Sequence, residues 1–300
     1  MSQFWEALEQ AKRDRALQAP PSLPVPAPPE PKGDSALRLV AEAPVEPLHR
    51  IDDHLVSLLA PASFAAEQYR ALRFVIEQTH RESAVSVVGV SSPSVGDGKT
   101  TTAINLAGAL SQASDARVLL LDLDVRRPQI GRRLGLDPNQ PGLVDAIVDP
   151  RLNLADIARA VRPFNFAVVL GGQSAKATYE LFKAARLRTL LEEARESYDY
   201  VVIDAPPLLP MPDCQLIGGF VDKFIVVLAC DKTPRRALAE ALNVLAADKV
   251  LGLVFNRSDQ LLSDYRREDY GEKVRGARWR WAAKRIQPFN GAKTRSSDIR

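Results

Sequence analysis

The sequence of 300 residues is long enough for one sizeable domain with appendages or for two small ones. With 46% hydrophobic and 26% charged residues, it has the composition of a soluble globular protein. No apolar run reaches the eighteen or so residues that a membrane-spanning helix needs, and the charged N-terminus is unlike a secretory signal. The two cysteines, Cys214 and Cys230, are too few for a disulfide framework. We expect both to be buried thiols of a cytoplasmic protein.

Charge is unevenly distributed along the chain. The net charge is +3, but residues 271–300 hold nine Lys/Arg and two acidic residues, so the remainder is mildly acidic. Between residues 275 and 285 the cations alternate with Trp279 and Trp281. Such a segment is most often solvated or packed on its own domain, and we rank this first. Contact with an anionic membrane surface ranks second, and nucleic acid is the least favoured partner.

The N-terminal segment, residues 1–50, is expected to have little fixed structure. Residues 2–17 have the spacing of a short amphipathic helix. Seven prolines follow between residues 20 and 31, and because proline donates no backbone hydrogen bond, this part is predicted to be an extended linker.

Residues 51–260 are predicted to form one α/β domain. A long helix is expected over residues 62–81, with apolar positions at Phe64, Tyr69, Leu72, Phe74, Val75 and Ile76. Short apolar runs rich in β-branched residues then alternate with amphipathic stretches, which is typical of a doubly wound, mostly parallel sheet covered by helices on both faces. The runs span residues 84–90, 117–124, 166–171, 200–206, 223–229 and 250–256. Residues 261–300 form the basic C-terminal tail.

The segment SSPSVGDGKTTT, residues 91–102, joins the first of these runs to a helical stretch. Pro93 stands where the G-x-x-x-x-G-K-[ST] pattern has its first glycine. Gly96 and Gly98 nevertheless allow backbone N–H groups to turn toward an anion, and the following helix N-terminus adds partial positive charge. Lys99 would reach the outer phosphates and the hydroxyl of Thr100 would hold Mg²⁺. We therefore predict a nucleotide-binding loop over residues 96–101, with Asp97 and Thr101 part of it.

Three aspartates end two other apolar runs. Asp122 and Asp124 close VLLLDLD, and Asp204 closes YVVID. In parallel sheets, ligands bind outside the carboxyl ends of the strands, which is also the edge from which the glycine loop emerges. We expect the three carboxylates to converge on one Mg²⁺–nucleotide.

The motifs GDGKTTTAINLA, VLLLDLDVRRP and YVVIDAPPLL resemble those of the bacterial tyrosine kinases of capsule and exopolysaccharide assembly. The resemblance covers residues 52–259 and includes EQYRALR, which matches that family's E-x-x-R-x-x-R helix. The wider superfamily is the ParA/MinD type of dimerising ATPase. Those ATPases carry a signature lysine five residues before the catalytic lysine, where this chain has Ser94. The sequence therefore favours the kinase branch and disfavours a DNA-partitioning ATPase.

The resemblance implies ATP and Mg²⁺ as the ligands and gives a role to each matching residue. Asp124 and Asp204 would help Thr100 hold the metal, and Asp122 would act as the base for an acceptor tyrosine. Asn256 would contact adenine, with Arg257 beside it. In the family, the helix that matches Glu67, Arg70 and Arg73 packs against a neighbouring subunit and builds a ring.

The tail offers two candidate phosphoacceptors, Tyr265 and Tyr270, in SDYRREDYGEK, where the family usually has a tyrosine-dense tail. Two functions therefore stay open. One is a protein-tyrosine kinase that phosphorylates itself in trans and regulates polysaccharide synthesis and export. The other is a nucleotide-gated assembly factor without kinase activity. In either case we expect self-association and a separate membrane partner that sets polysaccharide chain length, which would hold the protein at the inner face of the membrane.

Overall fold

The computed structural model describes residues 51–137, 139–172, 178–209, 213–230 and 232–257, together with the backbone of residues 280–282. All of these belong to one compact unit of the chain, Lys32–Arg300. The predicted N-terminal helix and proline-rich linker lie outside the described residues, as do most of the basic tail and both candidate tyrosines. In the described part, no helix is long and apolar enough to cross a membrane.

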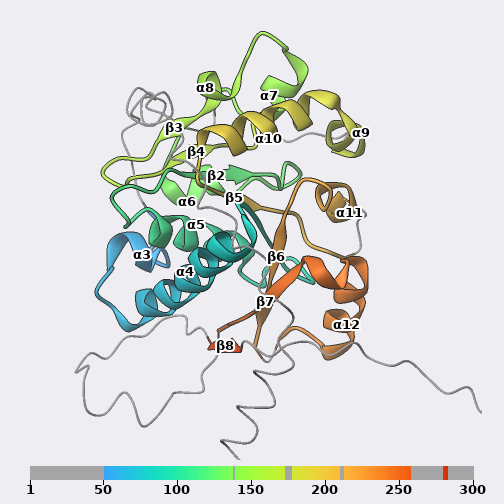
Figure 1. Ribbon diagram of the computed structural model, residues 1–300. Coiled ribbons are helices and arrows are strands. Elements are labelled where there is room, and N and C mark those ends of the chain that lie inside the picture. The colour runs from blue at the N-terminus through green and yellow to red at the C-terminus, as the bar shows by residue number, and fades with distance from the viewer. Residues whose placement is uncertain are drawn as a thin grey trace, which may run out of the picture. The chain divides into compact units, whose positions relative to one another are not determined.

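The described residues form an eight-stranded sheet with the order β3-β4-β2-β5-β1-β6-β7-β8 (Figure 1). Its six inner strands are mutually parallel, whereas β3 and β8 pair antiparallel with β4 and β7. The predicted mostly parallel sheet is therefore confirmed. The strands are β1 Val87–Ser91, β2 Val118–Asp122, β3 Arg159–Ala160, β4 Ala167–Val169, β5 Tyr200–Asp204, β6 Lys223–Ala229, β7 Val250–Asn256 and β8 Arg280–Ala282.

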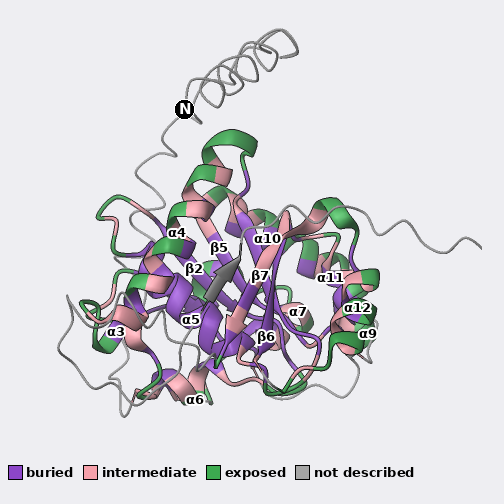
Figure 2. Cartoon of the chain, turned by 90° about the horizontal axis from the view of Figure 1, so that it is seen from below, coloured by how far each residue is buried: buried purple, intermediate pink, exposed green. Residues whose placement is uncertain are grey.

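Helices cover both faces of the sheet because successive strand residues point to opposite sides. On β2, Leu119 and Leu121 pack in one core, and Val118 and Leu120 in the other. Figure 2 shows how far this burial extends through the central strands and α5. The helices are α3 Val56–Leu59, α4 Phe64–Ser83, α5 Lys99–Leu110, α6 Ile130–Leu134, α7 Leu143–Val148, α8 Leu154–Ile157, α9 Thr178–Lys183, α10 Ala185–Ser197, α11 Asp213–Ile217, α12 Arg235–Val244 and the 3₁₀ turn η1 Ala247–Lys249.

The long helix expected over residues 62–81 is α4, shifted by two residues because Ser63 caps it. The Ser63 hydroxyl accepts a hydrogen bond from Ala66 N at 3.2 Å, which satisfies one free N–H of the first turn. The helix buries Ala66, Tyr69, Leu72 and Ile76, whereas the side chain of Phe74 is 60% exposed. Phe74 therefore belongs to the outer face of α4, since it lies on the side of the helix opposite Tyr69 and Ile76.

Two further differences from the sequence-based expectation concern the edge strands and one cysteine. β3 and β8 were not predicted, since a strand of two or three residues gives no periodic signal. Cys214 is buried, as expected, but Cys230 is only half-buried. Cys230 follows the last residue of β6, at the sheet edge that carries the site described next.

Candidate active site

The loop between β1 and α5 has the backbone of an anion cradle. Gly96 and Gly98 adopt φ angles of +87° and +107°, a left-handed region that side chains other than hydrogen rarely tolerate. Gly98 is also the N-cap of α5, so the helix begins at Lys99. The free N–H groups of the first turn of α5 therefore lie directly after the glycine turn, which favours binding of a negatively charged group.

Asp97 stabilises this loop from inside. Its side chain is 1% exposed, and its carboxylate accepts hydrogen bonds from Ser94 N at 3.0 Å and from the hydroxyl of Thr233 at 3.0 Å. Its backbone carbonyl accepts a third from Nδ2 of Asn256 at 2.8 Å. The carboxylate of Asp97 is thus used within the protein, and the residue links the glycine loop to the ends of β6 and β7.

Pro93 fits the loop without disturbing it. Its side chain is buried and its carbonyl accepts a hydrogen bond from Leu209 N at 3.3 Å, next to one from Leu208 N to Ser92 O at 2.8 Å. Proline has no backbone N–H, but the bond made here uses its carbonyl, which any residue supplies. The first half of the loop is therefore held against the segment that follows β5.

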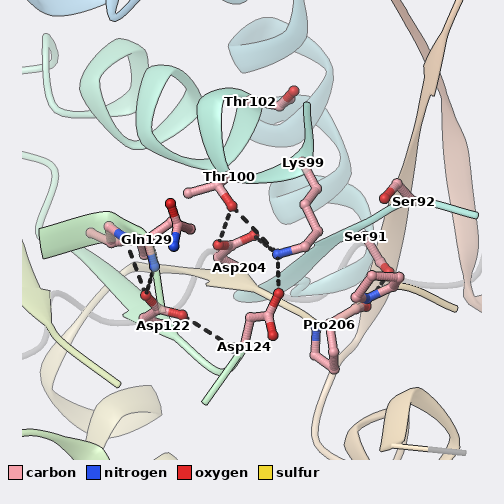
Figure 3. Close-up of polar contacts among 12 residues, drawn as sticks. Ser91, Ser92, Lys99, Thr100, Thr102, Asp122, Asp124, Gln129, Asp204 and Pro206 are labelled. Carbon is pink, nitrogen blue, oxygen red and sulfur yellow. Dashed lines mark hydrogen bonds and ion pairs between the residues drawn. The ribbon is translucent and has the colours of Figure 1, made fainter. Parts of the chain in front are cut away.

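Lys99 lies between two carboxylates (Figure 3). Its Nζ is 2.8 Å from Oδ2 of Asp124 and 3.1 Å from Oδ1 of Asp204. The hydroxyl of Thr100 donates to Oδ2 of Asp204 at 2.7 Å. Four side chains from α5, β5 and the end of β2 thus meet at one point, as the sequence predicts. Any cation that binds these carboxylate oxygens competes with the lysine ammonium.

Asp122 belongs to the same cluster but lies deeper. It is the register partner of Asp204 across β2 and β5, and neither residue has exposed surface. Its Oδ2 accepts from Gln129 N at 3.1 Å and from Ile130 N at 3.2 Å, and its Oδ1 accepts from Asp124 N at 3.1 Å. The loop between β2 and α6 therefore wraps around this carboxylate (Figure 3).

The pKa values in this cluster are shifted because several carboxylates lie close together and are buried. Burial raises the pKa of Asp122 well above its usual value, and the neighbouring Asp204 raises it further. Burial also raises the pKa of Asp204, although Lys99 opposes this. For Lys99, burial alone would lower the pKa, but Asp204 and Asp124 outweigh it and the pKa is raised. The ammonium is therefore held charged by carboxylates that need a counter-ion.

Asn256 and Arg257 end β7 beside the glycine loop. Asn256 is buried, and its Oδ1 has no hydrogen-bond partner among the described residues. Arg257 adopts φ +59° and donates from Nη2 to Gly96 O at 3.1 Å. The structure thus brings both residues to the loop, as expected, and leaves a buried acceptor there.

The donor set fits a magnesium nucleotide better than a metal bound by protein alone. Mg²⁺ prefers hard oxygen ligands and is usually held by one or two carboxylates together with phosphate oxygens. The cluster offers the Thr100 hydroxyl and the carboxylates of Asp124 and Asp204. In the described part of the chain, no group of three or more His, Cys, Asp or Glu residues is arranged to hold a metal ion unaided. Phosphate oxygens would complete the coordination.

Glu67, Arg70 and Arg73 do not join the site. Glu67 and Arg70 form an ion pair with each other on α4. Arg73 pairs with Glu77 at 2.6 Å and donates to Ala109 O at 3.1 Å, at the C-terminal end of α5. Lys99 begins the same helix at its other end. Arg73 therefore ties α4 to α5 within the chain.

Two supporting residues were missed by the sequence reading. Thr233 follows β6, and its hydroxyl bridges Ala229 N and Asp97. Asp213 begins α11, is 1% exposed and accepts from Nε of Arg126 at 2.8 Å. For Thr233 a signal existed, since β6 ends at the same sheet edge as the glycine loop. For Asp213 there was none, because it follows no strand end.

The fold and the site together define a P-loop ATPase-type nucleotide-binding protein. A family model described as an AAA domain matches residues 85–249. Tyrosine-protein kinase YwqD of Bacillus subtilis is 30% identical over 209 residues, which cover 69% of this chain and 87% of YwqD. The kinase domain of the Escherichia coli tyrosine kinase ETK superposes with a TM-score of 0.64 at 25% identity, covering 70% of this chain and 81% of that one. The chain belongs to the bacterial tyrosine-kinase family.

Some relatives are much longer. The succinoglycan biosynthesis transport protein ExoP of Rhizobium meliloti is 31% identical over 221 residues, which cover 72% of this chain. The same alignment spans only 28% of ExoP. This chain therefore corresponds to part of ExoP and to most of YwqD.

Proposed function

We propose that this protein is an ATP-dependent tyrosine kinase that phosphorylates its own tail in trans and regulates polysaccharide synthesis and export. The observation that carries the proposal is the convergence of Lys99, Thr100, Asp124 and Asp204 at the start of α5. Phosphoryl transfer requires mainly positioning and charge neutralisation, and this set supplies a cation, a hydroxyl and two carboxylates at one point.

Each part of the site has a task in this proposal. The backbone N–H groups of residues 96–101 and the ammonium of Lys99 bind the phosphates. Thr100, Asp124 and Asp204 hold Mg²⁺, which supplies positive charge to the phosphate oxygens when bound. Lys99 contacts both carboxylates, and the third N–H of its ammonium can donate to a phosphate oxygen.

Asp122 is the proposed base for the acceptor hydroxyl. It lies beside Asp204 in the sheet and accepts from Asp124 N, so it adjoins the point where the phosphates would bind. The three N–H donors fix its orientation, but its carboxylate has no exposed surface. A tyrosine therefore reaches it only when the loop between β2 and α6 moves. The test compares Asp122→Asn with Asp124→Asn: the first should lose transfer and keep ATP binding, and the second should lose the Mg²⁺ dependence of binding.

Asn256 is the proposed adenine contact, with Arg257 beside it. A buried carbonyl oxygen without a donor is costly, so a ligand that donates to it gains that free energy. The exocyclic amine of adenine is such a donor. Binding of ATP should therefore weaken in Asn256→Ala, and wild-type protein should prefer ATP to inosine triphosphate, which lacks that amine. Equal binding of the two nucleotides would refute the assignment.

The proposed kinase would have two kinds of partner, further copies of itself and a membrane protein. Glu67, Arg70 and Arg73 lie on α4 and would contribute to self-association, although Arg73 also has an internal role. A membrane protein that sets chain length would hold the kinase at the inner face of the membrane, aided by the basic tail. Nucleic acid is not a proposed partner.

The deciding experiment incubates the purified full chain with labelled ATP and Mg²⁺, alone and with the membrane partner's cytoplasmic segment, and maps phosphotyrosine. Lys99→Met should abolish labelling and hydrolysis. The alternative, a nucleotide-gated assembly factor, is favoured by the small number of tail tyrosines, two between residues 258 and 300. Hydrolysis without phosphotyrosine under both conditions would select that alternative.

A further inference from the structure

The loop that wraps Asp122 also presents arginines to solvent. Residues 123–129 connect β2 to α6, and Arg126, Arg127 and Arg132 are exposed along this loop and helix. Two backbone donors hold the loop in this structure: Arg127 N donates to Asp124 O at 2.9 Å, and Gln129 N donates to Oδ2 of Asp122 at 3.1 Å. Positive charge therefore lies next to the proposed catalytic carboxylate.

These arginines differ in what they contact. Arg126 pairs with the buried Asp213, and Arg133 pairs with Asp52 at 2.7 Å. Within the described ranges, Arg127 and Arg132 have no carboxylate partner, and Arg132 contacts only the neutral side chain of Gln129, at 2.7 Å. We call Arg127 and Arg132 the arginine rim. Their neighbours in sequence are neutralised by the protein itself, whereas the rim has charge left for an outside anion.

The chain supplies a segment of matching charge. Within two positions of Tyr270 lie Glu268, Asp269 and Glu272, whereas Tyr265 has Asp264 before it and two arginines, 266 and 267, after it. The segment starts close to the site, since Arg257 contacts Gly96 O at 3.1 Å. Thirteen extended residues span about 40 Å, so the segment can carry Tyr270 well beyond its own site to the rim of a neighbouring copy.

We propose that the arginine rim binds the acidic residues around Tyr270 and makes Tyr270, rather than Tyr265, the preferred phosphoacceptor. The inference rests on the proposed kinase function and adds a choice of substrate: tyrosines with acidic neighbours. In the transfer, a bond forms between the tyrosine oxygen and the γ-phosphorus while the bond from that phosphorus to ADP breaks. The phenolic proton passes to the carboxylate of the base, and ADP leaves.

The test measures the ratio of label at Tyr270 to label at Tyr265 in the full chain after incubation with ATP and Mg²⁺, by mass spectrometry. The ratio is internal to each sample, so it does not depend on overall rate. Exposed ion pairs are individually weak, so we expect label at Tyr270 to be about fivefold higher than label at Tyr265 in the wild type. Raising the salt concentration should bring it toward one, because exposed charges are screened.

Charge reversal provides the matched comparison. In Arg127→Glu/Arg132→Glu the ratio should fall below one, because the new carboxylates repel the Tyr270 flank and attract the arginines after Tyr265. The neutral variant Arg127→Gln/Arg132→Gln should give an intermediate ratio. Arg81→Glu is the control, since Arg81 is an exposed arginine near the C-terminal end of α4, before β1 and hence at the opposite edge of the sheet. Its ratio should equal that of wild type.

A compensating change tests the pairing itself. Adding Glu268→Lys/Asp269→Lys to the charge-reversed rim should restore the preference for Tyr270. An unchanged ratio in both rim variants, or loss of label at both tyrosines with hydrolysis retained, would overturn the inference while leaving the kinase activity of the wild type intact. Absence of phosphotyrosine in the wild type itself would overturn the kinase function and this inference with it.

Discussion

Thr233 donates a hydrogen bond from its hydroxyl to Oδ1 of Asp97 over 3.0 Å, although the two residues lie 136 positions apart. The same hydroxyl oxygen accepts from Ala229 N at 3.0 Å, and Asp97 O accepts from Asn256 at 2.8 Å. The glycine loop is therefore fastened to the ends of β6 and β7. Its shape depends on these side chains as well as on its own glycines.

Removing the Thr233 hydroxyl should weaken nucleotide binding. Thr233→Val keeps the shape but leaves Asp97 and Ala229 N without that partner, which costs about 1–2 kcal/mol. We expect ATP affinity, measured by isothermal titration calorimetry, to fall roughly tenfold. Thr233→Ser keeps the hydroxyl and serves as the control. Wild-type affinity in Thr233→Val would show that the bond does not shape the loop.

Gly96 should not tolerate a side chain. Its φ of +87° is strained for any other residue, and a Cβ there would lie 3.2 Å from Nζ of Lys232. Gly96→Ala should lose about 1–2 kcal/mol of unfolding free energy in urea denaturation, together with ATP affinity. Gly252→Ala on β7 is the matched control, because a Cβ there meets nothing within 4 Å. Equal stability of the two variants would contradict the strain.

Lys99→Met should destabilise the fold as well as abolish activity. The change leaves Asp124 and Asp204 as buried carboxylates without their cation, and breaking a buried ion pair in this way costs about 3–5 kcal/mol. Adding Asp204→Asn removes one of the uncompensated charges, so the double variant should regain part of the loss in urea denaturation. If Lys99→Met/Asp204→Asn is less stable than Lys99→Met, uncompensated carboxylate charge is not the main reason why the single variant is destabilised.

Much of the fold could be predicted because its signals are local. The six parallel strands are continuous apolar runs, and those of β6 and β7 end at the predicted residues 229 and 256. The long helix was also predicted, two residues from its observed bounds, but the sequence did not tell which of its apolar residues face inward. The antiparallel edge strands could not be predicted, since their pairing depends on contacts with β4 and β7 and not on a pattern of their own.

The candidate site also has parts that the sequence predicts and parts that it does not. Lys99, Thr100 and the three aspartates follow strands or open a helix, so the topology of a parallel sheet brings them to one edge. The burial of Asp122 beneath the loop of residues 123–129 could not be predicted, because it depends on backbone N–H groups of Gln129 and Ile130. The pairing of Arg73 with Ala109 O likewise depends on how α4 crosses α5.

Asp222 should make stability depend on pH. It precedes β6, and its Oδ2 accepts from Ser86 N at 2.9 Å and Val87 N at 2.8 Å, while Arg195 donates to both of its oxygens. Burial alone would raise its pKa, but the Arg195 hydrogen bonds and the backbone donors outweigh it, so the pKa is lowered. A depressed folded pKa stabilises the protein above the unfolded pKa of about 4, and this contribution disappears as the pH falls through the folded value.

Asp222→Asn should therefore lose about 2 kcal/mol of unfolding free energy at pH 7, since hydrogen bonds to a charged group are the stronger ones. The gap between wild type and variant should narrow as the pH falls below about 4, because the carboxylate becomes protonated first in the unfolded state and then, at lower pH, in the folded state. Urea denaturation at pH 7, 5, 4 and 3 measures this gap. Asp53→Asn is the control, because Asp53 is exposed and forms no salt bridge with the described residues. A gap that stays constant from pH 7 to pH 3 would mean that the charge of Asp222 does not hold the start of β1 against Arg195.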